Sequence, residues 1–139
     1  MDRKQASRQA VFGGADGLTL ALGLIVSLSG QPHAIVRAAA GAGLAEFVGM
    51  TAGAWLSDAS SGFMPALANG GAALLACVIP AMPYVLATGA AALITSLMLV
   101  AAVAGVISWL RPERGILAVA QTYGILLAAA ALCFGASLI

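Results

Sequence analysis

No charged side chain occurs between Asp58 and Arg111, and none occurs after Arg114. Across the whole chain, 62% of the residues are hydrophobic and 8% are charged, with a mean hydropathy of +1.04. Charged residues make up about 25% of an ordinary soluble domain, so this chain lacks the residues to cover a surface in water. Helices satisfy their own backbone hydrogen bonds in lipid. The sequence therefore predicts an all-α integral membrane protein.

The apolar residues form five segments. Each is close in length to the stretch of about 20 residues that a spanning helix needs. Turn residues such as Gly30 and Pro32 separate them. The predicted five-helix bundle is a single transmembrane domain, 1–139, with helices at 11–29, 34–57, 65–86, 89–110 and 115–138. Pro80 and Pro83 fall late in the third helix and should kink or end it. A neighbouring helix or water must then satisfy the freed carbonyl groups.

Lysine and arginine predict the orientation, because cytoplasmic loops are enriched in both. The basic residues precede the first span or lie between the fourth and fifth, at Arg3, Lys4, Arg8, Arg111 and Arg114. With five spans, the N-terminal segment and the loop between the fourth and fifth spans lie on the same side of the membrane. We therefore expect a cytoplasmic N-terminus and an outer C-terminus, in a prokaryotic cell membrane. Only Arg37 stands near the opposite face, and Trp55 and Trp109 should lie at the cytoplasmic interface.

Two acidic residues fall inside the spans, Asp16 in the first and Glu46 in the second. A charge at mid-bilayer costs about 2.5–3.5 kcal/mol on insertion scales, so such a residue indicates function. Met50 follows Glu46 by one turn on the same helix face. The alternatives are a helix cap for Asp16, a structural hydrogen bond for Glu46 and simple packing for Met50. Asp58 ends the second helix, where it is either solvated or the acid at which metal first binds.

Carboxylate oxygens suit Mg, Mn and Fe(II), whereas a thioether favours softer ions. The mixture predicts Fe(II) or Mn(II) and argues against Ca(II), which takes six to eight oxygen ligands. The ion is expected as a transported substrate, with no permanently bound cofactor. Metal and protons compete for the same carboxylates, which is the chemistry of an antiporter. We expect no enzymatic activity, and the absence of a basic patch beyond the N-terminal tail argues against a nucleic-acid partner.

Small residues repeat every four positions along two of the predicted helices. The first helix carries Gly13, Gly17 and Ala21, and the second carries Gly41, Ala45, Gly49 and Gly53. Such ladders let helix backbones approach closely. They predict either packing within one chain or the seam of a homodimer. Each membrane acid flanks a ladder, so both should lie at the edge of a tight helix contact.

The remaining polar residues have simpler interpretations. Cys77 and Cys133 are expected to behave as small buried apolar residues. His33 should be exposed in the outer loop. A polar patch at 121–123 within the fifth span should form hydrogen bonds between helices, although it could also line a path.

Three motifs together resemble the vacuolar iron transporter family, and the resemblance covers nearly the whole chain. The stretch FGGADGLT from Phe12 is similar to the family's "DG" helix, which matches Asp16 to its membrane aspartate. The stretch EFVGMTAGAWLS from Glu46 is similar to its metal-lined second helix, and IPAMPY from Ile79 to its double-proline motif. The resemblance implies a homodimer of five-helix protomers that transports Fe(II) or Mn(II) between their first and second helices.

The chain departs from the family at two places. Ala54 stands where family members commonly have a glutamate before the aromatic residue of the second helix. The short connection 58–64 replaces the long acidic cytoplasmic insert of eukaryotic members. Two other classes stay open: a small organic-cation or drug exporter, and a non-transporting membrane subunit of an iron-storage system. Five spans, the charge bias and the pairing of Met50 with Glu46 count against the exporter.

Overall fold

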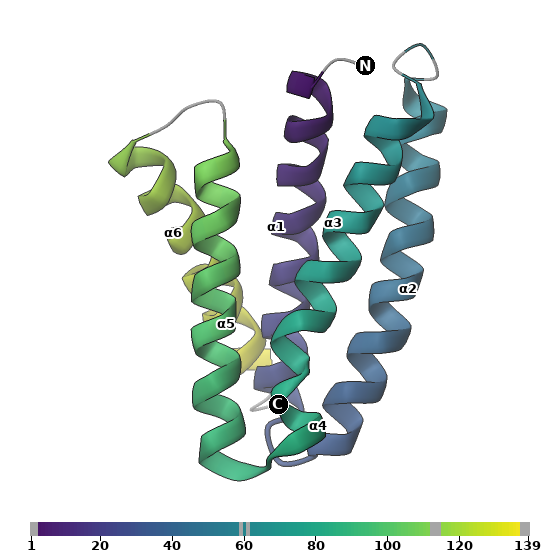
Figure 1. The fold of residues 1–139 in the computed structure, drawn as a ribbon. Coiled ribbons are helices and arrows are strands. Elements are labelled where there is room, and N and C mark those ends of the chain that lie inside the picture. Colours follow the sequence, from purple (N-terminus) through teal and green to yellow (C-terminus); the bar gives the residue numbers. More distant parts are fainter. Residues whose placement is uncertain (1–2, 59, 61, 112–114, 137–139) are drawn as a thin grey trace.

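The computed structural model describes residues 3–58, 60, 62–111 and 115–136. This part of the chain is helical, with five helices long and apolar enough to cross a membrane when α3 and α4 are counted as one span (Figure 1). The helices are α1 (Arg3–Ser27), α2 (Pro32–Ser57), α3 (Phe63–Ala81), α4 (Pro83–Leu86), α5 (Gly89–Leu110) and α6 (Ile116–Ala136). The chain is thus an all-α integral membrane protein, as the sequence predicts.

The observed helix ends differ from the predicted ones mainly at the start of the chain. The first helix begins at Arg3 instead of Val11. The added residues are mostly arginine, lysine, glutamine and alanine, which are good helix formers, so the helix continues beyond its apolar part. Asp2, the segment 112–114 and the end of the last predicted span, residues 137 and 138, lie outside the described residues.

The third span breaks where its two prolines predict a break. Helix α3 ends at Ala81 and α4 begins at Pro83. The Ser96 hydroxyl of α5 donates a hydrogen bond of 2.6 Å to the Pro80 carbonyl. A neighbouring helix therefore satisfies one carbonyl group at the end of α3. The Ile79 carbonyl, which loses its usual donor at Pro83, accepts from the Met82 amide at 3.2 Å.

Helix α3 lies between α1 and α2 and packs extensively on both (Figure 1). A methyl group at Gly13 would collide with Asn69, and one at Gly17 would collide with the backbone of Ala73. On the other side, a methyl group at Gly70 would collide with the Phe47 carbonyl of α2. Glycine is therefore required at these points by close helix contact. The ladder on α1 serves packing within the chain.

The ladder on α2 behaves differently. Gly41, Ala45, Gly49 and Gly53 are all exposed. A methyl group added at Gly41, Gly49 or Gly53 would meet no atom within 4 Å. We call this exposed strip the α2 glycine face. It is unpartnered within the described part of one chain.

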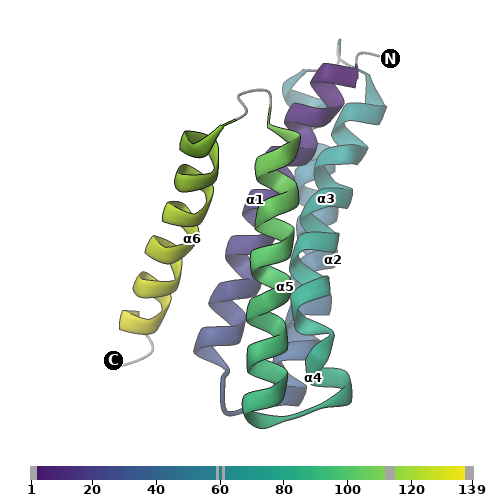
Figure 2. The ribbon, with the colours of Figure 1, turned by 60° about the vertical axis from the view of Figure 1, so that its left-hand side comes forward.

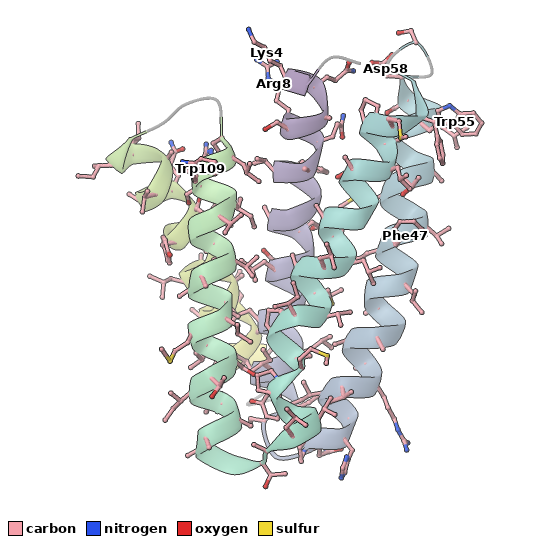
Figure 3. All side chains as sticks on the ribbon, in the orientation of Figure 1. Lys4, Arg8, Phe47, Trp55, Asp58 and Trp109 are labelled. Atoms are coloured by element: carbon pink, nitrogen blue, oxygen red, sulfur yellow. The ribbon has the colours of Figure 1, made fainter. Side chains whose placement is uncertain are left out.

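The two ends of the bundle differ in chemistry. Figure 3 shows Lys4, Arg8, Trp55, Asp58 and Trp109 at one end, which we call the N-terminal end. The two tryptophans lie at this same end, as the sequence predicts, and Trp55 contacts Phe63 edge-to-face with ring centroids 6.0 Å apart. The last helix runs to the opposite end (Figures 1 and 2). Which end faces the cytoplasm stays a prediction.

Cysteine labelling should place the N-terminal end inside the cell. In a variant lacking Cys77 and Cys133, cysteine introduced at Ser60 or Ile116 should react only after the membrane is opened. Cysteine at Gly30 or Thr88 should react with an impermeant reagent in intact cells, because these exposed residues lie in turns at the other end. Labelling of Ser60→Cys and Thr88→Cys from the same side would contradict the five-span arrangement.

Candidate functional site

Asp16 lies deep within α1 and not at its start. Because α1 begins at Arg3, Asp16 is more than three turns inside the helix, and the capping alternative no longer applies. Its side chain is exposed, and the next residue, Gly17, is where α1 meets α3. The carboxylate therefore stands at the edge of a tight helix contact, as the sequence predicts.

Glu46 lies on α2 directly before Phe47, which Figure 3 shows well inside the helix. The side chain is half-buried. Its Oε2 atom is buried and has no hydrogen-bond partner among the described residues. An unpaired buried oxygen of this kind is energetically costly. The alternative of a structural hydrogen bond therefore has no support at this atom.

The fold brings the two acids together from different helices. Asp16 and Glu46 are close enough for their charges to interact. Cys77 of α3 also lies within electrostatic range of Glu46. Direct contact between α1 and α2 is limited, so their shared neighbour α3 sets the positions of the two acids.

A cavity of about 550 Å³ opens between α1 and α2 at the N-terminal end. Helix α1 lines it with Arg8 and Phe12, α2 with Met50, and α3 with Asn69. Asp16 follows Phe12 by four residues and Glu46 precedes Met50 by four residues. Both acids therefore lie one turn further along their helices, away from the N-terminal end. Met50 stands between the cavity and Glu46, where a thioether could meet an ion first.

Asn69 is a polar residue of this site that the sequence analysis missed. It is 3% exposed, and its amide nitrogen donates a hydrogen bond of 3.4 Å to the Met50 carbonyl. Its Oδ1 atom is buried without a hydrogen-bond partner among the described residues. Asn69 thus touches both neighbouring helices and holds an unused oxygen. It is also the one carboxamide between Phe63 and Tyr84, a signal that could have identified it.

Asp58 lies at the C-terminal end of α2, outside the cavity lining. Its carboxylate accepts hydrogen bonds from Gln5 Nε2 at 3.4 Å and from the Ser60 hydroxyl at 2.6 Å. It is exposed at the N-terminal end of the bundle (Figure 3), directly after Ser57, which lines the cavity between α1 and α2. This position is compatible with first contact with a metal ion as well as with plain solvation.

The other polar residues occupy supporting positions. The Tyr123 hydroxyl donates to the Ala101 carbonyl at 2.8 Å, which confirms hydrogen bonding between helices for this residue of the polar patch on α6, whereas the Thr122 hydroxyl donates to the Ala118 carbonyl of its own helix at 2.9 Å. Cys77 is buried and its thiol lies 3.6 Å from the Ala39 carbonyl, whereas Cys133 is half-buried beside Gly23. His33 is exposed at the end opposite the cavity.

One chain supplies two carboxylates, a thioether and a carboxamide oxygen to this region. Within the described residues, no three His, Cys, Asp or Glu side chains gather as a metal site. No known family model, curated protein or solved structure matches the chain. The assignment to the vacuolar iron transporters therefore stays a prediction that depends on the three sequence motifs.

Proposed function

We propose that this protein transports a divalent transition metal, Fe(II) or Mn(II), out of the cytosol in exchange for protons. The observation that carries the proposal is the placement of Asp16 and Glu46 on different membrane helices, each one turn beyond a residue that lines the cavity between α1 and α2. Two negative charges repel strongly where little water screens them. Either a dication or protons relieve that repulsion. A pair that alternates between these occupants is the minimum requirement of a metal–proton antiporter.

The fold supports a homodimer around this site. Mn(II)-type ions favour octahedral coordination by oxygen ligands, which is more than one chain's acids and Met50 supply. The α2 glycine face is open, so the backbone of a second copy can approach it closely. A twofold axis along this face would add an identical set of ligands. The metal path would then lie between the first and second helices of the two protomers, as the family resemblance also implies.

The cavity between α1 and α2 supplies the route to the acids. An ion captured near Asp58 would pass Met50 before it reaches Glu46. Ala54 lines the cavity at the position where the family commonly has glutamate. A methyl group there leaves more room and one ligand fewer, so affinity for the ion should be lower than a glutamate would give.

The size of the same cavity favours a second candidate, a small organic-cation exporter. At about 550 Å³ the cavity falls within the range of small-molecule sites, about 300–1,000 Å³. Phe12 offers an aromatic face on which an organic cation could lie. The acids would then neutralise the bound cation without coordinating it.

Liposome transport tests the proposal directly. Purified protein should carry Fe(II) and Mn(II), and the flux should rise when the destination side is acidic, because the carboxylates must take up protons to release the ion. Co(II) and ethidium serve as probes of ion choice and of organic-cation transport, with protein-free liposomes as the control. Metal flux indifferent to the proton gradient would exclude antiport. Ethidium flux without metal flux would favour the exporter, and no flux of any probe would favour an accessory subunit.

A further inference from the structure

A second cavity, of about 250 Å³, lies between α1, α5 and α6 at the N-terminal end. Two arginines line it, Arg8 from α1 and Arg111 from the end of α5. Among the described residues the lining includes no carboxylate, and most of it is apolar, with walls such as Leu18, Ile107 and Leu126. A cavity with positive charge at one end and apolar side chains along the rest suits an amphiphilic anion.

Arg111 is held in place by the first turns of α6. Its guanidinium donates to the Gln121 side-chain oxygen at 2.9 Å, to the Ala118 carbonyl at 3.2 Å and to the Thr122 hydroxyl at 3.4 Å. All three acceptors are neutral, so none of them compensates the positive charge. A guanidinium has five N–H donors in a planar fork, and these bonds use three. The remaining donors suit a phosphate group.

Arg8 and Arg111 place one end of this cavity at the N-terminal end of the bundle. Trp109 and Arg8 stand at the same end of the bundle (Figure 3), and aromatic residues of this kind mark the membrane interface. Leu18 lies further along α1 from that end than Arg8, so the apolar wall extends toward the bilayer core. Sites that enclose a whole small molecule have volumes of about 300–1,000 Å³. This cavity is smaller, so it fits a headgroup phosphate and part of one acyl chain.

We propose that this cavity binds one anionic phospholipid, with the phosphate between Arg8 and Arg111 and an acyl chain against Leu18, Ile107 and Leu126. Two arginines attract a lipid with net negative charge and disfavour the ammonium of a zwitterionic one. Inorganic phosphate alone would leave the apolar wall unfilled. Arg8 also lines the first cavity, the one between α1 and α2 that Met50 lines. An anion bound in the second cavity would therefore draw the positive charge of Arg8 away from the first. The site itself is independent of what the protein transports.

Native mass spectrometry of the purified full chain tests this site. After delipidation and incubation with equal phosphatidylglycerol and phosphatidylcholine, the protein should retain at least about tenfold more phosphatidylglycerol. Arg8→Gln and Arg111→Gln should each lower that retention about fivefold, the factor expected for one basic residue near an anionic headgroup. Arg37→Gln is the matched control, because Arg37 is exposed near the opposite end. It should leave retention unchanged.

Arg8→Gln is the decisive variant, because Arg111→Gln also removes three hydrogen bonds to α6. Circular dichroism should show the same helix content in Arg8→Gln and the unmodified protein. Equal retention of both lipids, or an equal loss in Arg37→Gln, would overturn the proposal. Displacement of the lipid by millimolar inorganic phosphate would show a phosphate site with no need for the acyl chain, and would overturn it as well.

Discussion

Glu46→Gln and Asp16→Asn are each expected to reduce Fe(II) flux at least about tenfold, while the protein still inserts and keeps its helices. An amide keeps the shape of the acid but loses the charge that offsets dehydration of the ion. A tenfold effect requires only about 1.4 kcal/mol, far less than the full interaction of a carboxylate with a dication. Flux of ⁵⁵Fe(II) into proteoliposomes, corrected for the amount of inserted protein, measures the change.

Met50→Leu should have a smaller effect on Fe(II) flux than these two variants. It keeps the side-chain volume and removes only the soft ligand, so flux should fall less than in Glu46→Gln, and Fe(II) flux should fall more than Mn(II) flux. Normal Fe(II) flux in Glu46→Gln would remove the proposed mechanism. It would leave the unpaired Oε2 of Glu46 without a transport role and would revive the accessory-subunit alternative.

The spans and the acids could be predicted because the bilayer makes local composition decisive. A helix in lipid needs an apolar stretch of fixed length, so the five spans follow from the sequence alone. Asp16 and Glu46 are conspicuous for the same reason, since every charge inside a span is an exception. The break at Pro80 and Pro83 also follows locally, because proline lacks a backbone donor.

The partners of each helix face could not be predicted in this way. The two glycine ladders have the same spacing, yet Gly17 packs against Ala73 while Gly49 faces open space. Nothing in the spacing of small residues specifies which helix they meet. The central place of α3 likewise depends on contacts distant in sequence. The single carboxamide of Asn69 could have marked it as an exception within its span, but the sequence does not reveal which helices it bridges.

Gly17→Leu and Gly49→Leu should therefore fail in different ways, although both place leucine in a small-residue ladder. At Gly17, the added side chain must displace the backbone of Ala73, so α1 and α3 cannot keep their contact. Overpacking of this kind costs about 1–3 kcal/mol and more where the obstacle is backbone. We expect Gly17→Leu to lower the thermal unfolding midpoint strongly and to reduce the yield of folded protein.

At Gly49, a Cβ atom would meet no atom of its own chain within 4 Å, and the rest of the leucine side chain has the room of the cavity that Gly49 lines, so the protomer should fold as before. The side chain would instead hold a second copy away from the α2 glycine face and abolish the dimer in mild detergent. Light scattering of the purified variants separates the two effects, with Gly124→Leu on the exposed side of α6 as a control that should alter neither property. Equal unfolding midpoints for Gly17→Leu and Gly49→Leu would contradict the α1–α3 contact. A dimer that persists in Gly49→Leu would show that the α2 glycine face is not an interface, and the additional ligands would then have to come from elsewhere.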